Sequence, residues 1–150
     1  MPAKVPNPRK QFLFTIFMPG LDPFLAQEVK QPDDEFDVAE HGDVGHDIKT
    51  AGKRKLSNLS VTKILPSTTL DTYMRNWRNR IRNFITGGGE LPSTYKTAII
   101  IEEYSADGIT VLERHVYGGC WPQKVNGRDF SRKGSDNTVE TLEFSVDEVF

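Results

Sequence analysis

Apolar and polar residues follow one another in short runs along most of the chain, and turn residues separate these runs. Runs of β-branched and aromatic residues bounded by Gly, Pro, Asn and Asp are typical of strands. In the last run Leu142, Phe144 and Val146 alternate with polar residues, which predicts one buried and one wet face. The pattern predicts strands at about residues 11–18, 24–30, 36–40, 54–65, 95–104, 109–117 and 138–149.

Residues 68–85 show a different period, because their apolar residues recur every three or four positions. This spacing gives a continuous apolar stripe and predicts one amphipathic helix, capped by Ser67 or Thr68 and ended by the glycines at 87–89. Strands, one helix and further strands predict a mainly β fold. We expect a β-barrel or sandwich of two antiparallel sheets with a flanking helix. A chain of 150 residues is enough for one domain, spanning 1–150.

Residues 33–55 depart from both patterns. They form a stretch of 23 residues that cannot supply much core to a monomer. The charges are segregated, since acidic residues dominate up to Asp47 and basic residues follow from Lys49. We therefore expect a long projecting β-hairpin whose two limbs contact other copies through complementary charge. Its large apolar side chains are few: Phe36, Val38, Val44 and Ile48.

The overall composition changes this picture little. With 37% hydrophobic and 27% charged residues and a net charge of -2, the chain is an ordinary globular domain without the basic surface of a nucleic-acid-binding protein. The single cysteine, Cys120, excludes an internal disulfide, and its apolar surroundings predict a buried thiol. The Pro-rich residues 1–10 predict a flexible arm rather than a signal peptide, and no run is long enough to span a bilayer.

Candidate chemistry is sparse. One cluster, made of His41, Asp43, His46 and Asp47, has residue types that bind divalent cations, so a metal-dependent enzyme is one alternative. The cluster lies on a Gly-containing loop without a third histidine, which favours a polar exposed hairpin limb. The glycines at 87–89 follow a helix instead of opening one, so they are not a phosphate loop. We expect no enzyme, and therefore no catalytic residue, no cofactor and no bound metal.

A second group of charged residues lies on the predicted helix. Its four arginines spread around the helix and have no aromatic platform in a strand context, which disfavours binding of nucleic acid. A solvated face, one that can dock a partner protein, is the favoured interpretation. The arginines are Arg75, Arg78, Arg80 and Arg82.

Several segments resemble the tail tube proteins of contractile-tailed phages and of related contractile injection systems. The hairpin residues 40–43 and 46–53, the strand at 56–61 and a helix carrying Trp77 are similar to the first half of that family. The pair Trp121-Pro122 and residues 135–143 resemble its closing pattern. The likeness covers about residues 10–148.

The resemblance implies a structural role in a phage virion. Members form six-membered rings with an inner β-barrel, and the rings stack into a tube for DNA ejection inside a contractile sheath. The implied partners are other copies, the tail sheath, tape measure, baseplate hub and tail terminator proteins. DNA passes through the lumen without specific binding, and this chain does not insert into a membrane. Assembly is expected in the bacterial host cytoplasm.

The resemblance also suggests roles for particular surfaces. The hairpin is expected to contact neighbouring subunits and the next ring, and the four helix arginines are candidates for the outer face toward the sheath. Because an acidic or neutral wall would not bind DNA, the polar face of the last strand is a candidate lumen wall, made of Thr141, Glu143, Ser145 and Asp147. The candidate hairpin contacts are Glu40, His41, Asp43, His46, Asp47, Lys49, Lys53 and Arg54.

Two other functions fit the same sequence. An inner tube of a phage-like contractile injection system would have the same fold and carry protein cargo. A monomeric β-barrel module would bind a ligand or a partner through the loop at 33–55.

Overall fold

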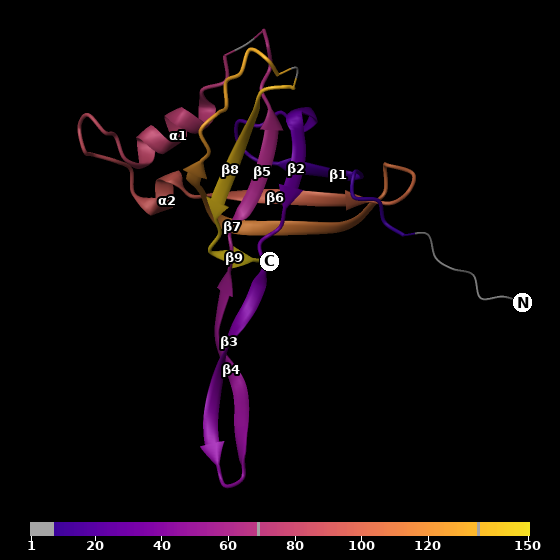
Figure 1. The fold of residues 1–150 in the computed structure, drawn as a ribbon, viewed down its shortest axis with the longest axis vertical. Coiled ribbons are helices and arrows are strands. Elements are labelled where there is room, and N and C mark those ends of the chain that lie inside the picture. The colour runs from indigo at the N-terminus through magenta and orange to yellow at the C-terminus, as the bar shows by residue number, and fades with distance from the viewer. Residues whose placement is uncertain (1–7, 69, 135) are drawn as a thin grey trace, which may run out of the picture.

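Strands are the main secondary structure of the chain, as the sequence predicts. The computed structural model describes residues 8–68, 70–134 and 136–150 (Figure 1). The strands are β1 (Phe14–Phe17), β2 (Ala26–Lys30), β3 (Asp34–Asp43), β4 (His46–Leu56), β5 (Leu59–Ile64), β6 (Thr97–Tyr104), β7 (Val111–Val125), β8 (Val139–Ser145) and β9 (Glu148–Val149). The helices are the 3-10 turn η1 (Pro23–Leu25), α1 (Tyr73–Ile81) and the short α2 (Pro92–Tyr95).

Seven of the strands form one antiparallel arrangement in the order β1-β6-β7-β8-β5-β2, with β9 added to β7. The long strand β7 belongs to two layers. Its first part pairs with β6 in the first layer, and its last part, from Trp121, pairs with β8 in the second layer, which continues to β5 and β2. The register shifts between Pro122 and Lys124, and such a bulge bends and twists a strand. Figure 1 shows β6 running across β5 and β8, so the layers form a sandwich. The described strands do not close into a barrel, and β1 and β2 are edges.

The core lies between the two layers and beneath α1. Trp77 on α1 is buried against Phe144, and its indole Nε1–H donates a hydrogen bond to the carbonyl oxygen of Tyr95 at 2.8 Å. Burial of one such side chain contributes about 2–3 kcal/mol. The alternation predicted for the last strand is confirmed in β8. The other buried apolar residues include Ile16, Leu59, Val61, Met74, Ile99, Ile101, Tyr117 and Leu142.

Helix α1 is shorter than the predicted helix at 68–85, which is wrong at both ends. The helix begins at Tyr73, whose amide donates to the carboxylate of Asp71, and not at a cap formed by Ser67 or Thr68. It ends at Ile81 because the side chain of Asn83 accepts amide hydrogen bonds from the next residues and forms a turn. Phe84 and Ile85 consequently lie outside the helix and are 98% and 95% exposed. Neither α1 nor the other helical segments of the described chain could span a membrane.

Two other predictions need correction. The strand predicted at 54–65 is two strands, because the chain leaves the hairpin at Leu56 and enters the large sheet at Leu59. Between these two strands the Ser57 hydroxyl accepts a hydrogen bond from the Asp33 amide at 2.7 Å, and this bond closes the base of the hairpin. The strand predicted at 109–117 continues to Val125, and the short helix α2 was not predicted. Helix α2 and the additional length of β7 depend on tertiary contacts, which local sequence patterns do not predict.

A lysine is buried among the apolar residues of the second layer. Lys63 points inward in line with Val61 and is fully buried, with its Nζ 2.7 Å from the Asp71 carboxylate and 3.6 Å from Glu140. The guanidinium of Arg128 lies 2.9 Å from Glu140 and completes the network. Burial alone would raise the pKa of Asp71, but the hydrogen bond and charge of Lys63 hold it below its usual value. This contribution to stability is present above about pH 4 and is lost as the pH falls through the folded pKa.

Substitution Lys63→Ala is expected to destabilise the fold strongly. The change leaves the carboxylates of Asp71 and Glu140 near a buried cavity without their cation, and breaking a buried pair in this way costs about 3–5 kcal/mol. Urea denaturation measures the loss. The control Lys124→Ala removes a surface lysine 3.8 Å from Glu143 and should cost less than about 1 kcal/mol. Equal losses in the two variants would contradict a structural role for the buried network.

Candidate assembly surfaces

The hairpin formed by β3 and β4 is separate from the rest of the fold. The two strands pair with each other from Asp34 opposite Leu56 to Asp43 opposite His46, and they form a sheet of their own. Figure 1 shows the hairpin projecting away from the sandwich, which confirms the predicted long hairpin. A two-stranded hairpin is at best marginally stable in water by itself. The hairpin therefore gains little support from the rest of the described fold.

Two ion pairs form within the hairpin, both near its base. The Arg54 guanidinium binds Asp34 with two nitrogens, one of them at 2.8 Å, and Lys55 lies 2.8 Å from Asp37. The antiparallel register places the acidic limb beside the basic limb, so part of the complementary charge is paired inside one chain. Exposed apolar side chains remain along the hairpin and are typical of an interface: Phe36, Val38, Val44 and Ile48.

The alternative of a metal site in the hairpin concerns four residues, and the structure describes the side chains of three of them. His41 lies opposite Ile48 and Asp47 lies opposite Gly42, so the side chains of His41 and Asp47 occupy opposite faces of the ribbon. The side chain of Asp43 is outside the described part of the structure. Among the described residues, His41, His46 and Asp47 do not form a group of converging ligands.

A different group of potential ligands lies where β6 and β7 pair. The ligand atoms of Glu103, Glu113 and His115 lie within 4.8 Å of one another. The guanidinium of Arg9 bridges the two carboxylates at 2.9 and 2.8 Å, and its hydrogen bond lowers the pKa of Glu113. The arginine therefore supplies the positive charge that a metal ion would supply. No sequence motif predicts this group, because only the strand register brings its members together.

The second layer presents a polar face opposite the core. Thr141, Glu143 and Ser145 lie on this face of β8, and Thr62 on β5 places its hydroxyl 3.4 Å from that of Thr141. The negative charge of Glu143 is compensated by Lys124, whose Nζ lies 3.8 Å from the Glu143 carboxylate. Asp147 lies beyond the end of β8 and pairs with Lys96 at 2.7 Å. Three of the four candidate lumen residues therefore share one face, which is rich in hydroxyl groups and balanced in charge rather than acidic.

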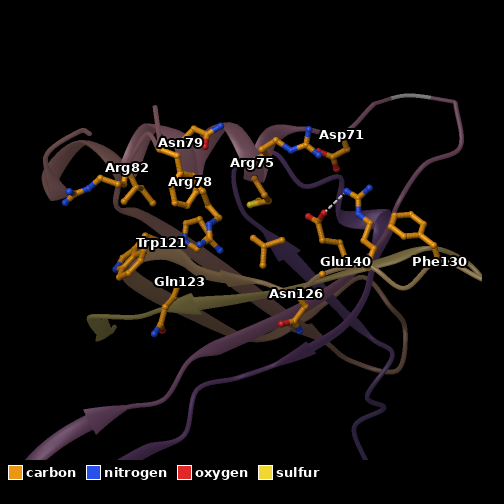
Figure 2. Close-up of a pocket in the computed structure, with 17 residues that line it drawn as sticks. Asp71, Arg75, Arg78, Asn79, Arg82, Trp121, Gln123, Asn126, Phe130 and Glu140 are labelled. Atoms are coloured by element: carbon orange, nitrogen blue, oxygen red, sulfur yellow. Dashed lines mark hydrogen bonds and ion pairs between the residues drawn. The ribbon is translucent and has the colours of Figure 1, made fainter. Parts of the chain in front are cut away.

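The helix arginines divide into two sets. Arg75, Arg78 and Arg82 line a groove of about 670 Å³ between α1 and the end of β7, whereas the fourth, Arg80, lies 3.9 Å from Glu90 outside it (Figure 2). Among the described residues the three groove arginines form no ion pair. The apolar part of the lining comes from α1, from the loop after it, from β7 and from the loop after β7: Met74, Ile81, Phe84, Trp121, Pro122, Val125 and Phe130.

The single cysteine is unsuited to nucleophilic chemistry. Cys120 is buried in the core, and burial raises the pKa of its thiol to about 12. The thiol is therefore protonated at neutral pH and lies close to the Tyr117 carbonyl oxygen, at 3.6 Å. The prediction that Cys120 is a buried side chain is confirmed.

The sequence model of the T4-like virus tail tube protein gp19 family matches residues 10–149. No curated protein sequence matches the chain. Among solved structures, one described as a PVC sheath/tube terminator of an extracellular contractile injection system has 20% sequence identity and a TM-score of 0.79, with 98% of each chain covered.

Two further structures have the same fold. An anti-feeding prophage structure described as a tube terminating cap has 20% identity and a TM-score of 0.80, covering 99% of this chain and 93% of the other. A type six secretion system protein has 16% identity and a TM-score of 0.51, covering 91% and 80%. At these identities the likeness concerns the fold.

Proposed function

The chain belongs to the T4-like virus tail tube protein family, and on this premise we propose that it is a structural subunit whose copies form rings that stack into a hollow tube. The observation that carries the proposal is the open sheet of the second layer. Strands β2, β5, β8 and the end of β7 form a four-stranded sheet with a polar face and two unpaired edges. An open sheet edge is a template for pairing with another chain.

The strand directions suit a ring of identical copies. Each neighbouring pair in this sheet is antiparallel, so β2 and β7 at its two edges run in opposite directions. A copy placed beside the first by rotation would set its β2 antiparallel to β7. Contacts of this head-to-tail kind close into a ring when the rotation allows it, and the family resemblance favours six copies. The continuous sheet would then form a barrel that no single chain forms.

The polar face of the four-stranded sheet is the proposed lumen wall. Hydroxyl groups and paired charges give this wall little net charge, so it would release few counterions from DNA and bind it weakly. Thr141, Glu143 and Ser145 lie on the wall, and Asp147 lies at its rim. The proposed cargo is DNA that is ejected through the tube. The balanced charge also favours a second candidate, the inner tube of a contractile injection system that carries protein.

The remaining surfaces suit contacts between stacked rings and contacts with a surrounding sheath. We assign the hairpin to contacts with neighbouring subunits and the next ring, using the exposed positions between Glu40 and Arg54. Arg80, outside the groove, is the candidate for the outer face toward a sheath. A tube of this kind would end on baseplate hub and tail terminator proteins and enclose a tape measure protein. It would be assembled in the bacterial host cytoplasm and act in the phage tail.

Replacement of residues 40–49 by an Asn-Gly turn tests the role of the hairpin. Glu40 lies opposite Lys49 and Ala39 lies opposite Thr50, so the change removes the projecting end and keeps the register of the remaining pairs. The core and the base at Ser57 remain, so thermal unfolding followed by circular dichroism should change little. Electron microscopy of the purified variant should show single rings or monomers, whereas the unaltered chain should form tubes. Tubes of wild-type length from the shortened chain would contradict the proposed stacking role.

Cysteine labelling tests the lumen assignment. Glu143→Cys places a thiol on the proposed wall, where the native side chain is 34% exposed, and Arg80→Cys places one on the outer side of α1 at a position 49% exposed. The thiol of Cys120 should not react with either maleimide, because it is buried. In assembled tubes a small maleimide should label both variants, whereas a maleimide on a bulky polymer should label only Arg80→Cys. Equal labelling of both by the bulky reagent would contradict the assignment.

A further inference from the structure

Two positions in the chain place an aspartate or an asparagine directly before a glycine: Asp107-Gly108 and Asn126-Gly127. Glycine has no Cβ, so its amide nitrogen can approach the preceding side chain more closely than the amide of any other residue. When this nitrogen attacks the side-chain carbonyl carbon, a succinimide ring forms. The surroundings of each position in the fold therefore decide whether the reaction can occur in the folded chain.

Hydrogen bonds restrain the first position, Asp107-Gly108. The Gly108 amide donates to the carbonyl oxygen of Ser105 at 2.9 Å. The Asp107 carboxylate accepts hydrogen bonds from the amides of Ile109 and Thr110 at 2.8 and 2.9 Å. The Ser105 hydroxyl and these amides lower the pKa of Asp107, so its carboxylate stays ionised and resists attack by a nucleophile. Both reacting groups of this position are held by other partners.

The second position, Asn126-Gly127, has none of these restraints. Asn126 follows the last residue of β7, and its backbone amide donates a hydrogen bond to the Thr141 carbonyl oxygen at 3.0 Å, where the pairing of β7 with β8 ends. Within the described part of the chain, neither the Asn126 side chain nor the Gly127 amide forms a hydrogen bond. Gly127 is exposed and lies outside the helices and strands. The attacking nitrogen and its target are therefore not held apart by other partners.

The other described asparagines are less suited to this reaction. None of them precedes a glycine, so the side chain of the next residue crowds the attacking nitrogen. Two of them lie in α1, whose backbone hydrogen bonds fix the chain, and the side-chain oxygen of a third, Asn83, accepts two backbone amides. These asparagines are Asn58, Asn76, Asn79, Asn83 and Asn137.

Asn126 lines the groove beside α1, and Figure 2 shows it on the side of the groove opposite the helix. Conversion of its neutral amide to a carboxylate would add a negative charge to a groove whose three arginines form no ion pair among the described residues. The Glu140 carboxylate of the same groove is already paired with Arg128 at 2.9 Å. No atom lies within 4 Å of where a Cβ on Gly127 would be, so an additional main-chain carbon also has room. The surroundings therefore accept the charge and the length of either product.

We propose that Asn126-Gly127 is a site of spontaneous modification, at which the folded chain converts an amide of the arginine-lined groove into a carboxylate. The Gly127 nitrogen loses its proton and bonds to the side-chain carbonyl carbon of Asn126, the bond from that carbon to the side-chain nitrogen breaks, and ammonia leaves. Water then opens the succinimide at either carbonyl and gives an aspartyl or an isoaspartyl residue. The net reaction consumes one water, releases one ammonia and changes no oxidation state. It needs only one chain, so it does not depend on the proposed function.

Incubation of the dilute full-length chain in a mildly alkaline buffer, followed by mass spectrometry of its peptides, tests the proposal. Position 126 should lose its amide before the other asparagines do. The variant Gly127→Ala should slow this loss by at least an order of magnitude, because the methyl group hinders the approach of the nitrogen. Gly127 has no positive φ and its added Cβ meets open space, so the variant should keep its circular dichroism spectrum. The control Gly134→Ala adds the same carbon in the same loop, 4.0 Å from the Ser131 carbonyl oxygen, and should convert like the unaltered chain.

Comparison with Asp107-Gly108 separates the effect of the fold from that of the sequence. An isoaspartyl methyltransferase with its methyl donor labels the isoaspartyl product at either position. In the folded chain the label should appear at position 126 and not at position 107, whereas unfolding in guanidinium chloride should add label at position 107. An Asn126 that converts only in the unfolded chain would overturn the proposal. Equal rates of conversion in Gly127→Ala and in the unaltered chain would also overturn it.

Discussion

The unpaired edges of the four-stranded sheet are the constraint on which the rest of the structure depends. Strands β2 and β7 lie at the two edges of this sheet and run in opposite directions, and no further strand of the described residues closes it. Backbone groups at such edges form hydrogen bonds with water or with another chain, and pairing with another chain is the route to aggregation unless it is specified. In the proposed ring of identical copies both edges would be paired at once. The polar face would form the inside of that ring, with α1 on the other side of the sheet.

The fold separates rigid parts from parts that depend on partners. The sandwich is fixed by a core in which Trp77 and Phe144 join the helix to the second layer, and by the buried Lys63 that ties Asp71 and Glu140 together. These contacts are internal and hold the open sheet in one shape. The hairpin and the groove lack such support. Among the described residues no other layer pairs with the hairpin, and the three groove arginines form no ion pair.

Much of the architecture could be predicted from local patterns. Alternation along 139–145 and the long apolar-poor stretch at 33–55 gave the right strand and hairpin, because each is a property of neighbouring residues. The helix ends were wrong, since the turn made by Asn83 overrides the apolar period that continues to Ile85. The surroundings of the candidate assembly residues could not be predicted. Pairing of Asp34 with Arg54 depends on strand register, and the groove depends on the packing of α1 against β7, neither of which a single sequence displays.

The most direct test of this account is hydrogen exchange of backbone amides in assembled particles and in dilute monomer, followed by mass spectrometry. We expect amides on the free edge of β2 and in the hairpin to exchange quickly in the monomer and to become protected on assembly, whereas amides of β5 and β8 should be protected in both states. Unchanged exchange in β2 and the hairpin on assembly would show that the open edge and the projecting strands are not completed by other copies. That result would contradict the central claim.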